Sequence, residues 1–119
     1  SQDNADRWEN FPSDREHLTQ LLDDLGRRNV VFVTGDIHMN YLGRASVSGT
    51  TPSEQAWEIC TTSGNANPLA EDLSADQFEF VSSAPHFPVL TFDPDLDTVH
   101  VAFHGVDGTV SFERTLDGA

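Results

Sequence analysis

The sequence contains no lysine, and its six basic residues, all arginine, stand against 20 acidic residues. The resulting formal charge of −14 repels the phosphate backbone of nucleic acids and anionic lipid surfaces, so we expect neither as a partner. The same field attracts divalent cations, although only diffusely. The composition therefore argues against a nucleic-acid-binding protein and is compatible with a protein that binds cations.

Cysteine is almost absent as well. Cys60 is the single one, which excludes a disulfide within the chain, and its apolar neighbours indicate a buried, unreactive thiol. The sequence has no run of roughly 20 apolar residues, so no membrane span is expected. No signal peptide is recognisable, and the chain starts at Ser1 rather than at methionine, which indicates a processed or excised piece.

The first regular element that the sequence predicts is a helix over residues 13–27. Ser13 and Glu16 have the spacing of a capping box, in which each side chain accepts a hydrogen bond from a free backbone N–H of the first turn. Gly26, followed by two arginines, is typical of a helix end. Four leucines between these signals recur at helical spacing and form one apolar face, namely Leu18, Leu21, Leu22 and Leu25.

Strands are predicted for most of the remaining chain. Residues 30–34 are continuously apolar, which is typical of a strand covered on both faces. The other expected elements are strands over 41–48 and 55–62, a loop over 63–76, an undecided segment over 76–81, and an antiparallel meander of 89–92, 99–103 and 110–115. The predicted fold class is α/β, in one segment 1–119, with one N-terminal helix, one buried strand and then mostly antiparallel strands.

The residues best suited to chemistry directly follow the apolar strand. Asp36 and His38 lie two positions apart, so in an extended backbone both side chains point to the same side. A carboxylate oxygen and an imidazole nitrogen suit a cation such as Ca, Mn, Zn or Fe, and Asn40 continues the spacing. Gly35 would let the backbone turn close to the ion. An ordinary turn capped by Asp36 is the structural alternative.

Two other stretches surround this motif in a recognisable order. Residues 4–15 read NADRWENFPSDR and resemble the N-x-D-x-W-(D/E)-x-(F/Y)-P-x-x-R segment of PhoD-like phosphatases. In that family the segment precedes a leucine-rich helix, an apolar strand and GD(V/I)H, and all of these occur here in the same order. Residues 58–64 and the final meander are similar to later parts of the family, more weakly. The chain is thus identified as a C-terminal segment of a PhoD-like metallophosphatase.

The resemblance implies a metal-dependent phosphoric monoester or diester hydrolase of the calcineurin-like metallophosphoesterase superfamily. Such enzymes have an αββα sandwich, with two or more metal ions at the strand ends that bind phosphate oxygens and activate a hydroxide. It also implies that the protein is secreted. The implied metal ligands are His38 and Asp36. The residues implied near the substrate or behind the ligands are Asn4, Asp6, Trp8 and Asn40.

The N-terminal metal motifs of the family are absent from this chain. Those motifs would supply the bridging aspartate and most other ligands, so we expect the chain to be inactive alone and to require the missing N-terminal part. Met39 also stands where family members commonly have a small residue. The alternative hypothesis is a non-catalytic, acidic, β-rich domain, in which residues 35–38 form a structural turn or an isolated cation site.

Overall fold

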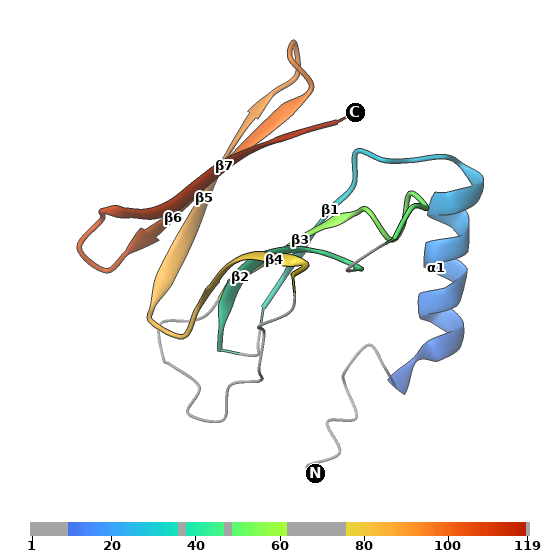
Figure 1. Cartoon of the computed structure of the whole chain (residues 1–119), viewed down its shortest axis with the longest axis horizontal. Helices are drawn as coiled ribbons and strands as arrows, with labels where there is room; N and C mark the ends of the chain where they lie inside the picture. Colours follow the sequence, from blue (N-terminus) through green and yellow to red (C-terminus); the bar gives the residue numbers. More distant parts are fainter. Residues whose placement is uncertain (1–9, 36–37, 47–48, 62–75, 119) are drawn as a thin grey trace.

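The computed structural model describes residues 10–35, 38–46, 49–61 and 76–118 (Figure 1). One helix precedes seven strands, which form two sheets. Their bounds are α1 Pro12–Asp24, β1 Val31–Thr34, β2 Asn40–Arg44, β3 Trp57–Cys60, β4 Phe78–Ser82, β5 His86–Asp93, β6 Thr98–Gly105 and β7 Val110–Asp117. The expectation of one helix followed by mostly antiparallel strands is confirmed.

The helix α1 begins one residue before the predicted start and ends at Asp24, three residues before the predicted end, while the predicted stop signal at Gly26 is confirmed. Pro12 occupies the first turn, and Phe11 is the N-cap without any side-chain hydrogen bond. The predicted capping box is therefore wrong, because proline's fixed φ starts the helix one residue earlier and places Ser13 inside the first turn. At the other end Gly26 has a φ of +61°, and Arg27 N–H donates to the Leu22 carbonyl at 3.0 Å. This left-handed stop is the arrangement for which glycine is favoured.

The apolar face of α1 is only partly covered. Leu21 is 46% exposed and Leu25 is 58% exposed, and no residue of α1 is fully buried. Polar contacts attach the helix instead, since the two carboxylate oxygens of Asp23 accept hydrogen bonds from the backbone N–H and the hydroxyl of Ser53. Figure 1 shows α1 on the side of the molecule away from the β5–β7 sheet.

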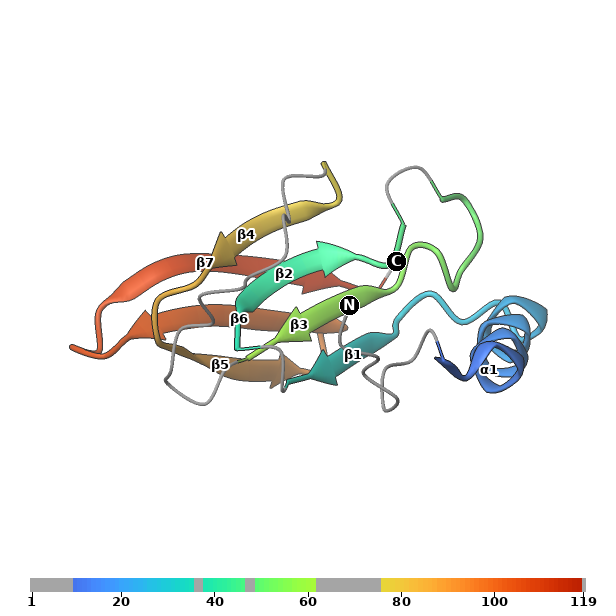
Figure 2. The same ribbon diagram turned by 90° about the horizontal axis from the view of Figure 1, so that it is seen from below.

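The first sheet has the strand order β1-β3-β2-β4 (Figure 2). β1 and β3 are parallel, whereas β2 is antiparallel to both of its neighbours. The prediction that residues 30–34 are covered on both faces is wrong, because Val33 is 61% exposed and Thr34 is exposed too. In the described part of the chain, β1 pairs with β3 only and lies at the sheet edge. The strands predicted at 41–48 and 55–62 are shorter, and the undecided segment contains β4. The loop predicted at 63–76 falls almost wholly outside the described residues.

The second sheet is the predicted meander, with the order β5-β6-β7. Its first turn is closed by Asp93, whose Oδ1 accepts hydrogen bonds from two backbone N–H groups, both at 3.1 Å. The two sheets pack face to face around one apolar core. The buried members of this core are Leu42, Trp57 and Ile59 from the first sheet and Val101, Phe103 and Leu116 from the second.

Arginine side chains close one part of the interface between the sheets. The Arg44 guanidinium lies 3.7 Å from the centre of the Trp57 ring, and the Arg114 guanidinium lies 5.2 Å from it. Arg114 on β7 also forms an ion pair with Glu79 on β4, at 2.8 Å. Two cations over one indole are tolerated here because the ring's negative face attracts them and Glu79 offsets part of their repulsion.

Candidate metal site at the strand ends

Four strands of the first sheet bring polar segments to one edge. Thr34 at the end of β1 is level with Cys60 at the end of β3, because these strands are parallel. Tyr41 at the start of β2 is level with Cys60 too, and Asn40 pairs with Ser82 at the end of β4. The ends of β1, β3 and β4 and the start of β2 therefore lie together at this edge. Ligand sites of α/β proteins form at such carboxyl ends of strands.

His38 lies at this edge in a left-handed conformation, with a φ of 58°. Its side chain is half-buried, and among the described residues it has no hydrogen-bond or ion-pair partner. Gly35 passes close to β3, since a Cβ at that position would lie 3.3 Å from the Thr61 carbonyl oxygen. The imidazole therefore lies near the strand ends, and no described residue forms a hydrogen bond or an ion pair with it.

Asn40 has a structural partner. Its side chain is completely buried, and its Nδ2 donates to the carbonyl oxygen of Ala84 at 3.0 Å. This bond joins the start of β2 to the turn between β4 and β5. The predicted role of Asn40, near the substrate or behind the metal ligands, stays a prediction.

The other predicted site residues fall in segments outside the described residues. These are Asp36, Asn4, Asp6 and Trp8. Their assignment as a metal ligand and as neighbours of the substrate stays a prediction. The described residues contain no group of three or more histidine, cysteine or acidic side chains that could hold a metal ion. His38 fits as one ligand of such a site, and the others have to come from elsewhere.

The remaining histidines of the second sheet have partners of their own. His86 Nδ1 lies 2.9 Å from the Ala84 carbonyl oxygen and its Nε2 lies 2.9 Å from the Ser111 hydroxyl. Because a carbonyl only accepts, Nδ1 carries the proton in this arrangement. His100 contacts the carboxylate of Glu113 at 3.1 Å, in a cross-strand pair. The His86 ring joins β5 to β7 across β6, the His100 ring joins the adjacent strands β6 and β7, and both contribute to the fold.

One residue at this edge was not predicted from the sequence. The Oε1 atom of Glu58, on β3, accepts a hydrogen bond from the Thr34 hydroxyl at 2.9 Å and one from the Tyr41 hydroxyl at 2.7 Å. Burial, assisted by the Glu58 hydrogen bond and charge, raises the pKa of Tyr41, so its phenol remains a donor. The only sequence signal for a role of Glu58 was its place as the acidic residue at the start of residues 58–64, which resemble the family.

Burial also raises the pKa of the Cys60 thiol, which agrees with the prediction of a buried, unreactive cysteine.

Comparison with known proteins identifies the family. Residues 1–114 match the PhoD-like phosphatase family. The chain belongs to this family. It is also 26% identical over 83 residues to alkaline phosphatase D of Bacillus subtilis (strain 168), an alignment that covers 68% of this chain and 14% of that protein. No solved structure matches the chain.

The family match agrees with the order of the motifs in the sequence. This PhoD-like chain spans only about one seventh of the length of the curated relative that it matches, at 14%. A complete phosphatase of that length would carry most of its residues outside this segment. Among the described residues, no helix combines the length and the apolar character that crossing a bilayer requires.

Proposed function

We propose that this chain is the C-terminal part of a metal-dependent phosphoric ester hydrolase, in which His38 and Asp36 are metal ligands. The observation that carries the proposal is the place of His38. It offers an imidazole without a partner among the described residues, at the strand-end edge of a PhoD-like chain. A neutral imidazole is the commonest protein ligand of metal ions, and such edges are where ligands bind.

The ions that we propose are Ca, Mn, Zn or Fe, and the substrate is a phosphate ester. When bound, metal ions polarise phosphoryl oxygens and generate a hydroxide nucleophile at moderate pH. This chain's part is to present a ring nitrogen of His38 to the ion, with Asn40 holding the adjacent backbone. Because the chain carries a charge of −14, a phosphate ester also needs the local positive centre that the ions supply. We place Asn4, Asp6 and Trp8 close to this substrate.

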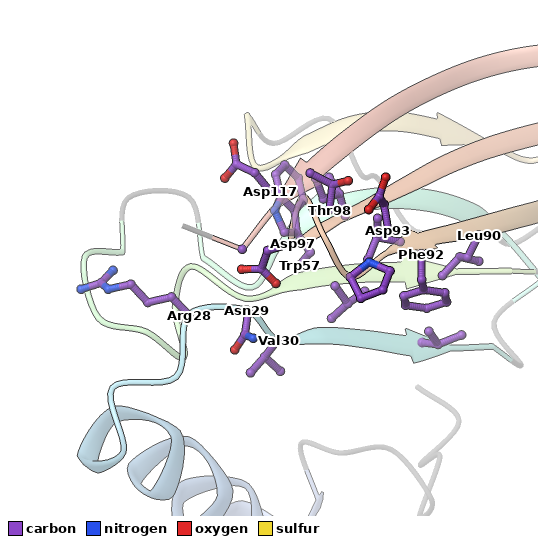
Figure 3. Close-up of a pocket in the computed structure, with 16 residues that line it drawn as sticks. Arg28, Asn29, Val30, Trp57, Leu90, Phe92, Asp93, Asp97, Thr98 and Asp117 are labelled. Carbon is purple, nitrogen blue, oxygen red and sulfur yellow. The ribbon is translucent and has the colours of Figure 1, made fainter.

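We further propose that the complete protein is a secreted enzyme with an αββα sandwich, whose N-terminal part covers an open side of this chain. A cleft of about 400 Å³ separates β1 from β5 on that side (Figure 3). Its apolar wall includes Val33, which is 61% exposed, and Phe92, which is 69% exposed. Inward-facing residues with such exposure are typical of a core that further strands complete.

The open side gives an expected result for this chain taken alone. We expect the 119-residue chain to self-associate as its concentration rises, because an uncovered apolar cleft and the free edge of β1 favour pairing between copies. Light scattering over a concentration series measures this. The double substitution of Val33→Lys and Phe92→Glu is expected to reduce association, whereas Val106→Lys at the exposed β6–β7 turn should not. A monomeric wild-type chain at all concentrations would contradict the proposal of a missing partner segment.

The enzymatic proposal is tested with the full-length protein. Hydrolysis of p-nitrophenyl phosphate and of bis-p-nitrophenyl phosphate is followed at alkaline pH, after removal of metals by EDTA and after addition of each candidate ion. We expect turnover only after an ion is restored, and the two esters distinguish a monoesterase from a diesterase. The isolated chain is expected to be inactive. If the full-length protein hydrolyses neither ester with any ion, the alternative of a non-catalytic acidic domain would hold.

A further inference from the structure

The two strands on either side of His38 are separated by a third strand. β1 and β2 follow one another in the sequence, yet β3 lies between them in the sheet. Thr34 of β1 and Tyr41 of β2 are both level with Cys60, at the carboxyl end of β3. The path of the segment between them depends on how its two ends are fixed to β3.

One carboxylate of β3 holds both ends. Glu58 Oε1 accepts from Thr34, the last residue of β1, at 2.9 Å, and from Tyr41, the second residue of β2, at 2.7 Å. Tyr41 is 8% exposed, and its ring makes an edge contact with Phe78 at 5.2 Å. Because an ionised carboxylate accepts strong hydrogen bonds, both contacts are charge-assisted. Glu58 thereby joins three strands at a single atom.

Neighbouring contacts limit the rest of the segment. Met39 is 4% exposed, and Asn40 is fully buried and bonded to Ala84. His38 between these contacts has a positive φ of 58°, a conformation that persists in non-glycine residues when the surroundings impose it. The backbone ladders of β3 fix Thr34 and Tyr41, and the hydrogen bonds of Glu58 add a side-chain contact that acts on both sides of His38.

We propose that Glu58 is a positioning residue for His38, acting through Thr34 and Tyr41, and that it thereby sets the metal affinity of the site. The inference rests on the proposed function, in which His38 is a ligand. Glu58 lies on a strand, and both of its partners lie outside residues 35–39. Its Oε1 atom is used by Thr34 and Tyr41, so Glu58 acts on the segment through the two ends. Mutation of residues that orient metal ligands typically costs about 10- to 100-fold in metal affinity.

The test is Mn²⁺ affinity of the metal-free full-length protein, measured by the loss of the free Mn²⁺ signal in electron paramagnetic resonance. Glu58→Ala is expected to weaken binding by about 10- to 100-fold. Glu58→Gln should stay close to wild type, because its amide oxygen can accept both hydrogen bonds. Glu113→Gln is the matched control, since it changes a hydrogen-bonded carboxylate on the other sheet and should leave the affinity unchanged.

A second variant covers the case in which Glu58→Ala does not fold. The double substitution Thr34→Val with Tyr41→Phe removes both donors and keeps the packing of the Tyr41 ring, so it is expected to weaken Mn²⁺ binding to a similar extent. Wild-type Mn²⁺ affinity in this folded double variant would overturn the inference.

His38→Ala separates this inference from the function on which it rests. If His38→Ala weakens Mn²⁺ binding and the Glu58 and double variants do not, the positioning role is wrong while the ligand role stands. If His38→Ala itself binds Mn²⁺ like the wild type, the proposed metal site is wrong, and the positioning role fails with it.

Discussion

In the full-length protein, His38→Ala is expected to lower metal-dependent hydrolysis of p-nitrophenyl phosphate by at least about 100-fold. Loss of a residue that supports a ligand from behind typically costs 10- to 100-fold, and loss of the ligand itself should cost at least the upper end of that range. The described residues offer no substitute, since they contain no alternative cluster of metal-binding side chains. Initial rates at saturating Mn²⁺ measure the effect.

His100→Ala is the matched control for that substitution. It also removes an imidazole, but one that pairs with Glu113 on the second sheet, so activity should remain within about twofold of the wild type. Thermal melting of both variants shows whether the fold is retained. Undiminished turnover in a folded His38→Ala protein would mean that His38 is not a ligand and that the metals lie elsewhere.

The largest expected effect on stability comes from Phe103→Ala, at about 3–5 kcal/mol in the free energy of unfolding. Phe103 is completely buried on β6, between the two sheets, and its ring centre lies 4.7 Å from that of Phe80. Truncation removes apolar contacts and leaves a cavity that the two sheets cannot fill without moving. Urea unfolding followed by tryptophan fluorescence measures the change, since Trp57 belongs to the same core.

Phe92→Ala serves as the comparison for the core substitution. The same atoms are removed, but Phe92 is 69% exposed, so the expected loss is below about 1 kcal/mol. Equal losses in the two variants would contradict the assignment of the core to the interface between the sheets.

Elements with local signals were predictable from the sequence. The alternating residues of the meander and the Asp93 turn depend on neighbours within a few positions, and the structure agrees with both. The left-handed turn at Gly26, which follows the end of α1, is local in the same sense. The helix start was missed by one residue because Pro12 and Ser13 both favour a helix N-terminus, and proline at the first position decided it.

Features that depend on distant partners were not predictable. An apolar run such as residues 30–34 does not reveal whether its strand lies inside a sheet or at its edge, and Val33 is exposed because β1 has a described neighbour on one side only. In the sequence, nothing distinguishes Glu58 from an ordinary polar residue of a strand. Its role depends on Thr34 and Tyr41, which reach it only because β3 separates their strands.

The placement of β3 between β1 and β2 also bears on how the chain folds. A hairpin of β1 and β2 would have to open again, because β3 inserts between them in the sheet. β3 begins more than ten residues after the end of β2. Closing that loop costs entropy before any contact compensates for it, whereas β5, β6 and β7 pair through short turns. We therefore expect the meander to form early and to offer its apolar face as a template. The strand edge that carries His38 would then be among the last parts to reach its native arrangement.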